Sequence, residues 1–275
     1  MVRCRVDHRW ALRWVFMNID TNWPAYLISR AIAQPPADCF VIDGTTPVIA
    51  FGDPVKARVA TLGINPSRNE FLDPSGTLLV GKRRRLATLE SLNLGDRTTL
   101  NEGHGASVLD GCADYFKVRS YAWFKPLNYI LNESIHASYG TDACHLDLVQ
   151  WATNPVWRAL DKTIRSRLLD DGVGFLNTQL ATEEYELVIV NGRTVMNAVE
   201  AAGITSWISI GPVLQNPTTH LYEGRRGSQR FLSWSCNLQS QPGARRHIDA
   251  LVDFVKTNAG FNMPRRDLWV GDAAK

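Results

Sequence analysis

The sequence has little of what marks a secreted, metal-binding or membrane-spanning protein. Its 275 residues include five cysteines without a CxxC pair, and the odd number argues against a disulfide framework. The six histidines show neither HxxxH nor HExxH spacing, so we expect no metal site, and no other cofactor is expected. No apolar run approaches the roughly eighteen residues of a membrane span, and residues 1–20 do not resemble a signal peptide. We therefore expect a cytoplasmic protein with no membrane partner.

The excess of positive charge is small overall, but lysine and arginine residues form local clusters. The formal net charge of +3 does not by itself indicate a nucleic-acid partner, because such binding depends on a local basic face. Each basic cluster is either solvated surface or a contact to phosphate. Three clusters lie next to predicted loops: Lys82 with Arg83, Arg84 and Arg85; Arg225 and Arg226 with Arg230; and Arg245 with Arg246.

Strand and helix patterns alternate along the chain. We expect one domain at residues 46–260, preceded by a helical extension at 1–45 and followed by a tail at 261–275. The alternation predicts an α/β fold whose sheet is mostly parallel and covered by helices on both faces. The expected strands are residues 46–51, 59–64, 143–149, 187–190, 218–223 and 230–235. The expected helices are residues 23–33, 83–94, 107–116, 123–134, 156–169, 174–180, 193–202 and 244–256.

The most informative stretch is ARVATLGINPSRNEF at residues 57–71. Its apolar start suits a strand buried on both faces of a parallel sheet. Gly63 then allows close backbone approach, Asn65 offers an amide, and Pro66 fixes the following turn. Ligands of open α/β sheets bind beyond the carboxyl ends of the strands. Asn65 is therefore a candidate catalytic residue, although the alternative is an asparagine that caps a turn.

The segment Gly63-Ile64-Asn65-Pro66-Ser67 resembles the first motif of the uracil-DNA glycosylase superfamily, in its Gly-x-Asn-Pro form. With later segments, the likeness covers about residues 48–255. The resemblance implies a three-layer α/β/α fold with a central, mostly parallel four-stranded sheet. It also implies a monomer that flips a base out of double-stranded DNA into a pocket beside Gly63, Ile64, Pro66 and Ser67. Asn65 would then hold the water that attacks C1′ of the sugar, so positioning and electrostatics would carry the rate.

Asp147 departs from this resemblance in an informative way. The strand HLDLV at residues 145–149 aligns with one in which uracil-reading relatives carry asparagine. A carboxylate accepts a hydrogen bond from the N4 amino group of cytosine and, if burial raises its pKa, can also donate to N3. Asp147 therefore favours a cytosine edge, or alternatively only holds a neighbouring loop.

Ser67 stands where enzymes strict for uracil place a tyrosine that excludes a substituent on C5. A serine leaves that side open, so Ser67 and Asp147 together predict a C5-modified cytosine. Some members of the superfamily are anti-phage glycosylases that remove glucosylated hydroxymethylcytosine from viral DNA, and the chain is similar to that group.

An aromatic side chain is expected to stack on the flipped base. Phe71 is the first candidate, with Tyr115 and Phe116 behind it, and Trp151 is expected to wall the pocket. Each of these aromatic residues is alternatively part of the core.

The last motif of the family is altered. Relatives carry His-Pro-Ser followed by a wedge residue, whereas residues 235–243 read SCNLQSQPG. Asn237 is expected to donate to the base in place of the histidine, with His145 or His220 as substitutes. Parallel strands would bring Asn65, Asp147, Asn191 and Asn237 to one rim. The residues expected to contact DNA are Leu238, Gln239 and Ser240 in this loop, with Arg83, Arg84, Arg85, Arg245 and Arg246.

The expected function is thus a monofunctional DNA glycosylase that leaves an abasic site, because no lysine in the key motifs offers a Schiff-base nucleophile. Alternatives are a uracil or hypoxanthine repair glycosylase and a catalytically silent reader of modified DNA. A nucleotide hydrolase or binder is disfavoured, because the chain has neither GxGxxG after its first strand nor GxxxxGK[ST].

Overall fold

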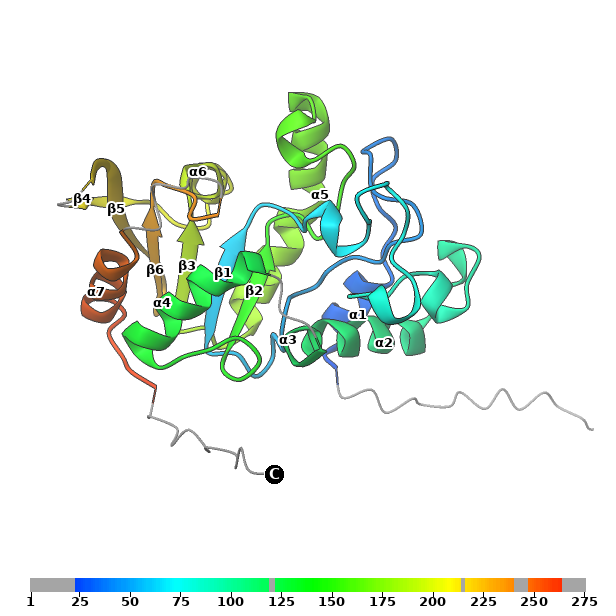
Figure 1. Cartoon of the computed structure of the whole chain (residues 1–275), viewed down its shortest axis with the longest axis horizontal. Coiled ribbons are helices and arrows are strands. Elements are labelled where there is room, and N and C mark those ends of the chain that lie inside the picture. Colours follow the sequence, from blue (N-terminus) through cyan, green and yellow to red (C-terminus); the bar gives the residue numbers. More distant parts are fainter. Residues whose placement is uncertain (1–22, 119–121, 214–215, 240–246, 264–275) are drawn as a thin grey trace, which may run out of the picture.

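The computed structural model describes residues 23–118, 122–213, 216–239 and 247–263. These residues form one sheet of six strands in the order β2-β1-β3-β6-β5-β4 (Figure 1). Parallel pairing joins β2 (Ala143–Asp147), β1 (Val59–Gly63), β3 (Leu187–Asn191) and β6 (Gln229–Trp234). Antiparallel pairing adds β5 (Asn216–Arg226) and β4 (Ile208–Val213) at one edge. The α/β class is confirmed, but the sheet is mixed and the prediction of four strands is wrong.

The three strands that position the site are buried on both faces. Every residue of β1, β2 and β3 is buried, as their mostly apolar sequences predict. β4 escaped prediction because most of its residues are exposed and its pairing with β5 is irregular near Gly211. An edge strand of this kind lacks the apolar pattern on which a sequence-based prediction depends.

Helices cover both faces of the sheet (Figure 1). On one face, Val59 of β1 shares a core with α4 (Lys125–Ile135) and α7 (Ile248–Asn258). On the other face, Ala60 and Leu62 share a core with α5 (Lys162–Thr182) and α6 (Arg193–Ala201). Because side chains alternate along a strand, Thr61 and Gly63 face the same side as α4.

A third core lies beside β2 and joins α1 (Ala25–Ala31), α2 (Glu102–Ala113) and α3 (Tyr115–Val118) to the segment that contains Phe51. Residues 46–51 were predicted to form a strand, but they form only an isolated bridge from Phe51 to His145. The domain boundaries at residues 45 and 260 stay predictions.

Two predicted helical regions differ from the structure. Residues 83–94 form no continuous helix: Leu86 and Leu89 are buried, but the backbone makes only short 3-10 turns at Gly81–Arg83 and Glu90–Leu92. The two helices predicted at 156–169 and 174–180 are largely one helix, α5, which Asp161 caps by accepting from the Ile164 backbone N–H at 2.9 Å. The short 3-10 turns are η1 (Arg68–Glu70), η2 (Gly81–Arg83), η3 (Glu90–Leu92), η4 (Arg97–Thr99), η5 (Ala122–Phe124) and η6 (Trp157–Ala159).

Gly172 explains how α5 passes so close to the segment that leaves β2. A Cβ atom at this position would lie 2.3 Å from the carbonyl oxygen of Leu148. The glycine inside α5 is therefore a packing requirement and not a helix end. No helix among the described residues is long and apolar enough to cross a membrane.

Candidate functional site

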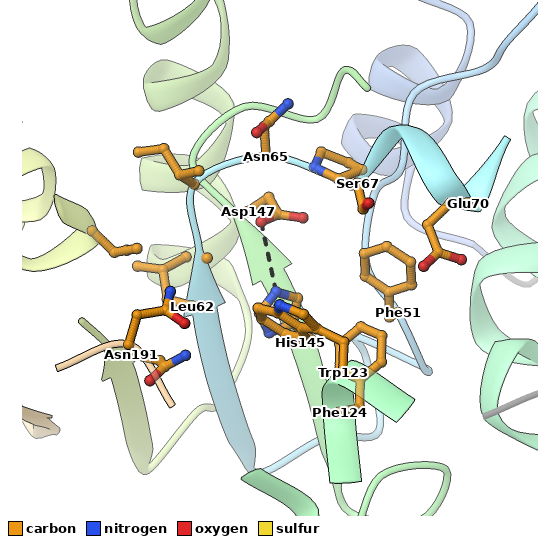
Figure 2. Close-up of a pocket in the computed structure, with 15 residues that line it drawn as sticks. Phe51, Leu62, Asn65, Ser67, Glu70, Trp123, Phe124, His145, Asp147 and Asn191 are labelled. Carbon is orange, nitrogen blue, oxygen red and sulfur yellow. Dashed lines mark ion pairs between the residues drawn. The ribbon is translucent and has the colours of Figure 1, made fainter. Parts of the chain in front are cut away.

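A cavity of about 200 Å³ opens where β1, β2 and β3 end (Figure 2). Two carboxylates, one imidazole, three asparagines and three aromatic rings meet there. Its lining is Phe51, Leu62, Gly63, Ile64, Asn65, Pro66, Ser67, Glu70, Trp123, Phe124, His145, Asp147, Asn191, Val195 and Asn237. The structure thus brings together the predicted residues Asn65, Asp147, Asn191 and Asn237 at one rim.

The cavity exists because β1 ends in a glycine. Gly63 is paired in register with Asp147 of β2, and β3 with Asn191 lies on its other side. A Cβ atom at Gly63 would lie 2.5 Å from Asp147 Oδ1 and 2.8 Å from His145 Nε2. Because Gly63 has no side chain, it leaves the space of the cavity unfilled between β2 and β3.

His145 is held by hydrogen bonds beneath the cavity. Its Nδ1 lies 2.7 Å from the hydroxyl of Thr61, which in turn lies 2.6 Å from the hydroxyl of Tyr139. Its Nε2 lies 3.6 Å from Asp147 Oδ1, and both side chains are buried. These contacts fix the ring so that Nε2 is directed to the carboxylate (Figure 2).

Asn65 is oriented by its amide nitrogen. Nδ2 donates to the carbonyl oxygen of Trp151 at 3.2 Å and, more weakly, to the hydroxyl of Thr153 at 3.4 Å. No described residue donates to Oδ1, which is left as an acceptor at the mouth of the cavity. Ser67 also lines the cavity, and its hydroxyl caps η1 by accepting from the Asn69 backbone N–H at 3.2 Å.

Glu70 lines the cavity but was not predicted as a site residue from the sequence. Its side chain is 2% exposed, and its Oε2 accepts from the Tyr115 hydroxyl at 2.8 Å and lies 3.6 Å from Arg85 NH1. Burial raises the pKa of Glu70 above its usual value, Tyr115 and Arg85 oppose this rise, and the nearby charge of Asp147 adds to it. In the sequence, Glu70 stands in the polar run SRNE and resembles a solvated turn.

The predicted aromatic residues do not line the cavity. Phe71 is 1% exposed and, like Tyr115, belongs to the core beside β2, while the indole of Trp151 is buried and donates to Asp171 at 2.9 Å. None of these three side chains lines this cavity, and their predicted roles as stacking partners or wall stay predictions. Phe116 packs flat against Tyr139 and does not line it either. The rings that do line it are Phe51, Trp123 and Phe124, whose centroids lie 5.8, 5.2 and 5.2 Å from that of His145.

The loop that follows β6 is held by hydrogen bonds to Asn191 and Trp123. Asn191 Oδ1 accepts from Trp234 Nε1 at 2.9 Å and from the Leu238 backbone N–H at 3.3 Å. Asn191 Nδ2 donates to Gln239 Oε1 at 2.6 Å, and Gln239 Nε2 donates to the carbonyl of Trp123 at 2.9 Å. Leu238 is 0% exposed, so Leu238 and Gln239 are committed to internal contacts and are not free to enter DNA.

The other residues predicted in this region divide into three groups. Asn237 lines the cavity, and its Oδ1 accepts from the Gln239 backbone N–H at 3.0 Å. His145 lies in the cavity, whereas His220 does not line it. Ser240, Arg245 and Arg246 lie outside the described residues.

The arginines at residues 83–85 do not line the cavity. Arg83 NH1 lies 3.6 Å from Asp73 Oδ2, Arg85 pairs with Glu70, and Arg84 is exposed. A groove of about 650 Å³ continues outward from the cavity instead, and four other arginines line it: Arg68, Arg158, Arg165 and Arg193. They are scattered in the sequence, so no local charge cluster indicates them.

Among the described residues, no three side chains of His, Cys, Asp or Glu come together in a way that could hold a metal ion. No protein-family model matches this chain, and no curated protein matches it.

Proposed function

We propose that this protein is a monofunctional DNA glycosylase with a three-layer α/β/α fold of the uracil-DNA glycosylase type. Its substrate would be a flipped C5-modified cytosine, such as glucosylated hydroxymethylcytosine of viral DNA. The observation that carries the proposal is that Asn65, just beyond the end of β1, and Asp147, at the end of the neighbouring β2, meet at one cavity with His145. The four parallel strands β2-β1-β3-β6 also agree with the core sheet that the resemblance implies.

The size of the cavity supports a single base as its occupant. Pockets for drug-sized ligands measure about 300–1,000 Å³, and this cavity is smaller, at about 200 Å³. Phe51, Trp123 and Phe124 give it aromatic walls, which favour a flat ring. The sugar would then lie at the mouth, beside Asn65.

Hydrolysis would proceed by water held on Asn65 Oδ1. The water oxygen attacks C1′, the bond from C1′ to the base nitrogen breaks, and its electron pair leaves with the base. One proton of the water stays on the new C1′ hydroxyl and the other passes to solvent, while the departing base anion takes up one proton from solvent; the products are an abasic site and the free base. An amide is too weak a base to remove that proton early, so Asn65 contributes position, while the His145 imidazole contributes electrostatic stabilisation of the departing base.

The polar groups of the cavity complement a cytosine edge. Asp147 offers an acceptor for the N4 amino group. Ser67 borders both the cavity and the outer groove, so a group on C5 can extend past its small side chain. No lysine is among the described residues that line the cavity, which supports hydrolysis without strand cleavage.

The test is to incubate the full chain with DNAs that bear uracil, hypoxanthine, 5-hydroxymethylcytosine or glucosylated hydroxymethylcytosine, and to detect abasic sites by alkaline cleavage. We expect cleavage of the glucosylated substrate and none by the Asn65→Ala variant. Preference for uracil or hypoxanthine would instead indicate a repair glycosylase. Tight binding of modified DNA without abasic sites would indicate a silent reader, the alternative that the missing motif histidine favours.

A further inference from the structure

The groove outside the cavity is strongly basic. Arg68, Arg158, Arg165 and Arg193 line it, and no aspartate or glutamate does. Asn65, Ser67, Asn191 and Asn237 border both spaces, so the groove leads directly into the cavity. A positive lining without local compensation is the feature that attracts a polyanion.

The four arginines come from separate elements that meet only in the fold. Arg68 begins η1, Arg158 lies in η6, Arg165 lies near the start of α5, and Arg193 begins α6. Arg68 NH1 donates to Asn154 Oδ1 at 3.0 Å. None of the four forms an ion pair with a carboxylate among the described residues, so their charges remain available to phosphate.

Two tryptophan side chains also line the groove. Trp157 and Trp123 both line the groove and both are half-buried, so each presents part of its ring to the groove. Arginines beside aromatic rings are the combination by which proteins hold unpaired strands, since phosphates pair with the arginines and bases stack on the rings. In a duplex the faces of the bases are covered by their neighbours.

The final loop favours an unpaired strand for a second reason. An enzyme that flips a base out of a duplex must fill the hole it leaves, whereas a base in single-stranded DNA needs no extrusion from a pair. In the described part of this loop, Leu238 is fully buried and Gln239 is bonded to Asn191 and Trp123. Neither residue is available as a wedge.

We propose that the groove lined by Arg68, Arg158, Arg165 and Arg193 binds single-stranded DNA, with a base beside the target stacked on Trp157. Under the proposed function, on which this inference rests, the modified nucleotide enters the cavity from an unpaired strand. The expectation of a double-stranded substrate is thereby replaced by an expectation of a single-stranded one.

The first test measures binding of the full chain to a fluorescent unmodified oligonucleotide by anisotropy. The same strand is offered alone, annealed to its complement, and as an RNA of the same sequence. We expect the single DNA strand to bind at least about tenfold more tightly than the duplex at equal salt. Equal or tighter binding of the duplex would overturn the inference, and equal or tighter binding of RNA would overturn the assignment to DNA.

The second test removes two charges inside the groove and two outside it. For a single strand the slope of log Kd against log salt changes by about 0.7 per phosphate contact, so Arg158→Ala with Arg165→Ala should flatten it by about 1.4. The matched control, Arg83→Ala with Arg84→Ala, removes the same charge from exposed positions outside the groove and should leave the slope unchanged. An equal change in both pairs would contradict the proposed track.

Trp157→Ala should weaken single-strand binding by about tenfold, the loss of one stacked base, without changing the salt slope. Trp157→Phe keeps a ring and should restore most of the affinity, which a merely structural loss would not predict. Thermal melting shows that each variant is folded. Single-strand binding without excision of any modified base would reject the glycosylase proposal alone, whereas excision with duplex preference would reject only the groove.

Discussion

Two asparagines at the rim of the cavity, Asn65 and Asn191, follow or end neighbouring strands but have opposite environments. Asn65 is half-buried, and its Oδ1 accepts from no described residue. Asn191 is 2% exposed, and both its oxygen and its nitrogen are engaged within the protein. The comparison shows that two polar side chains at the carboxyl ends of neighbouring strands can differ in function: Asn191 is saturated with structural hydrogen bonds, whereas Asn65 keeps an acceptor that a ligand can use.

The largest effect expected from this difference is on activity. Asn65→Ala should lower single-turnover excision at least about a hundredfold, the loss that follows removal of one positioned polar group. The melting temperature should change little, because Asn65 donates only two long hydrogen bonds to the scaffold. Unchanged excision by a folded variant would remove Asn65 from the mechanism.

Asn191→Ala should act on stability instead. It deprives the Trp234 indole and the Leu238 N–H of their acceptor, and an unsatisfied buried donor costs about 1–3 kcal/mol, so we expect a loss of about 2–3 kcal/mol. Urea unfolding measures the change. Asn191→Asp keeps the acceptor and should lose less. A variant that stays fully stable yet loses excision would place Asn191 with Asn65 in the chemistry.

Asp147→Asn tests whether the second cavity residue that we assign to the reaction, Asp147, recognises the base. An amide reverses half of the hydrogen-bond pattern, so excision of modified cytosine relative to uracil should fall by about 1–3 kcal/mol. The ratio of single-turnover rates on the two bases measures the effect, with Asn65→Ala as the control that lowers both rates together. An unchanged ratio would refute base reading by Asp147.

The smallest expected effect is a pH dependence of the unfolding free energy that comes from Glu70. Its pKa is raised in the folded protein, so its contribution to stability is complete below the ordinary value of 4.5 and is lost as pH rises through the raised pKa. Glu70→Gln removes this titration. Its unfolding free energy relative to wild type should therefore be constant at low pH and increase above it.

Asp73→Asn is the control for that measurement. Hydrogen bonds, first from Ser75, lower the pKa of Asp73, so its contribution to stability appears as pH rises and is lost in acid. The variant should consequently lose stability relative to wild type as pH rises, opposite to Glu70→Gln. Urea unfolding across the acid range separates the two, and a pH-independent difference for Glu70→Gln would show that folding does not raise the pKa of Glu70.

The parts of the site that lie on buried strands were predictable from the sequence. Mostly apolar runs located β1, β2 and β3, and parallel geometry then placed Asn65 and Asp147 at one edge. The assignment of Asn65 and Asp147 to water and base remains a prediction.

The other parts depend on contacts between distant segments, which no local pattern carries. Glu70 is buried by Tyr115, 45 positions away, and the aromatic walls come from Phe51 and Trp123 on separate segments. The basic groove likewise assembles from arginines on four different elements. By contrast, the obvious basic run at residues 83–85 lies outside both spaces.

The close approach at Gly172 packs α5 against the segment that leaves β2. α5 carries Arg165 into the groove and, at Gly172, touches the carbonyl of Leu148. Three residues beyond Leu148, the carbonyl of Trp151 holds the amide of Asn65. The helix that lines the groove and the amide at the rim of the cavity are therefore supported by one short segment, residues 148–151.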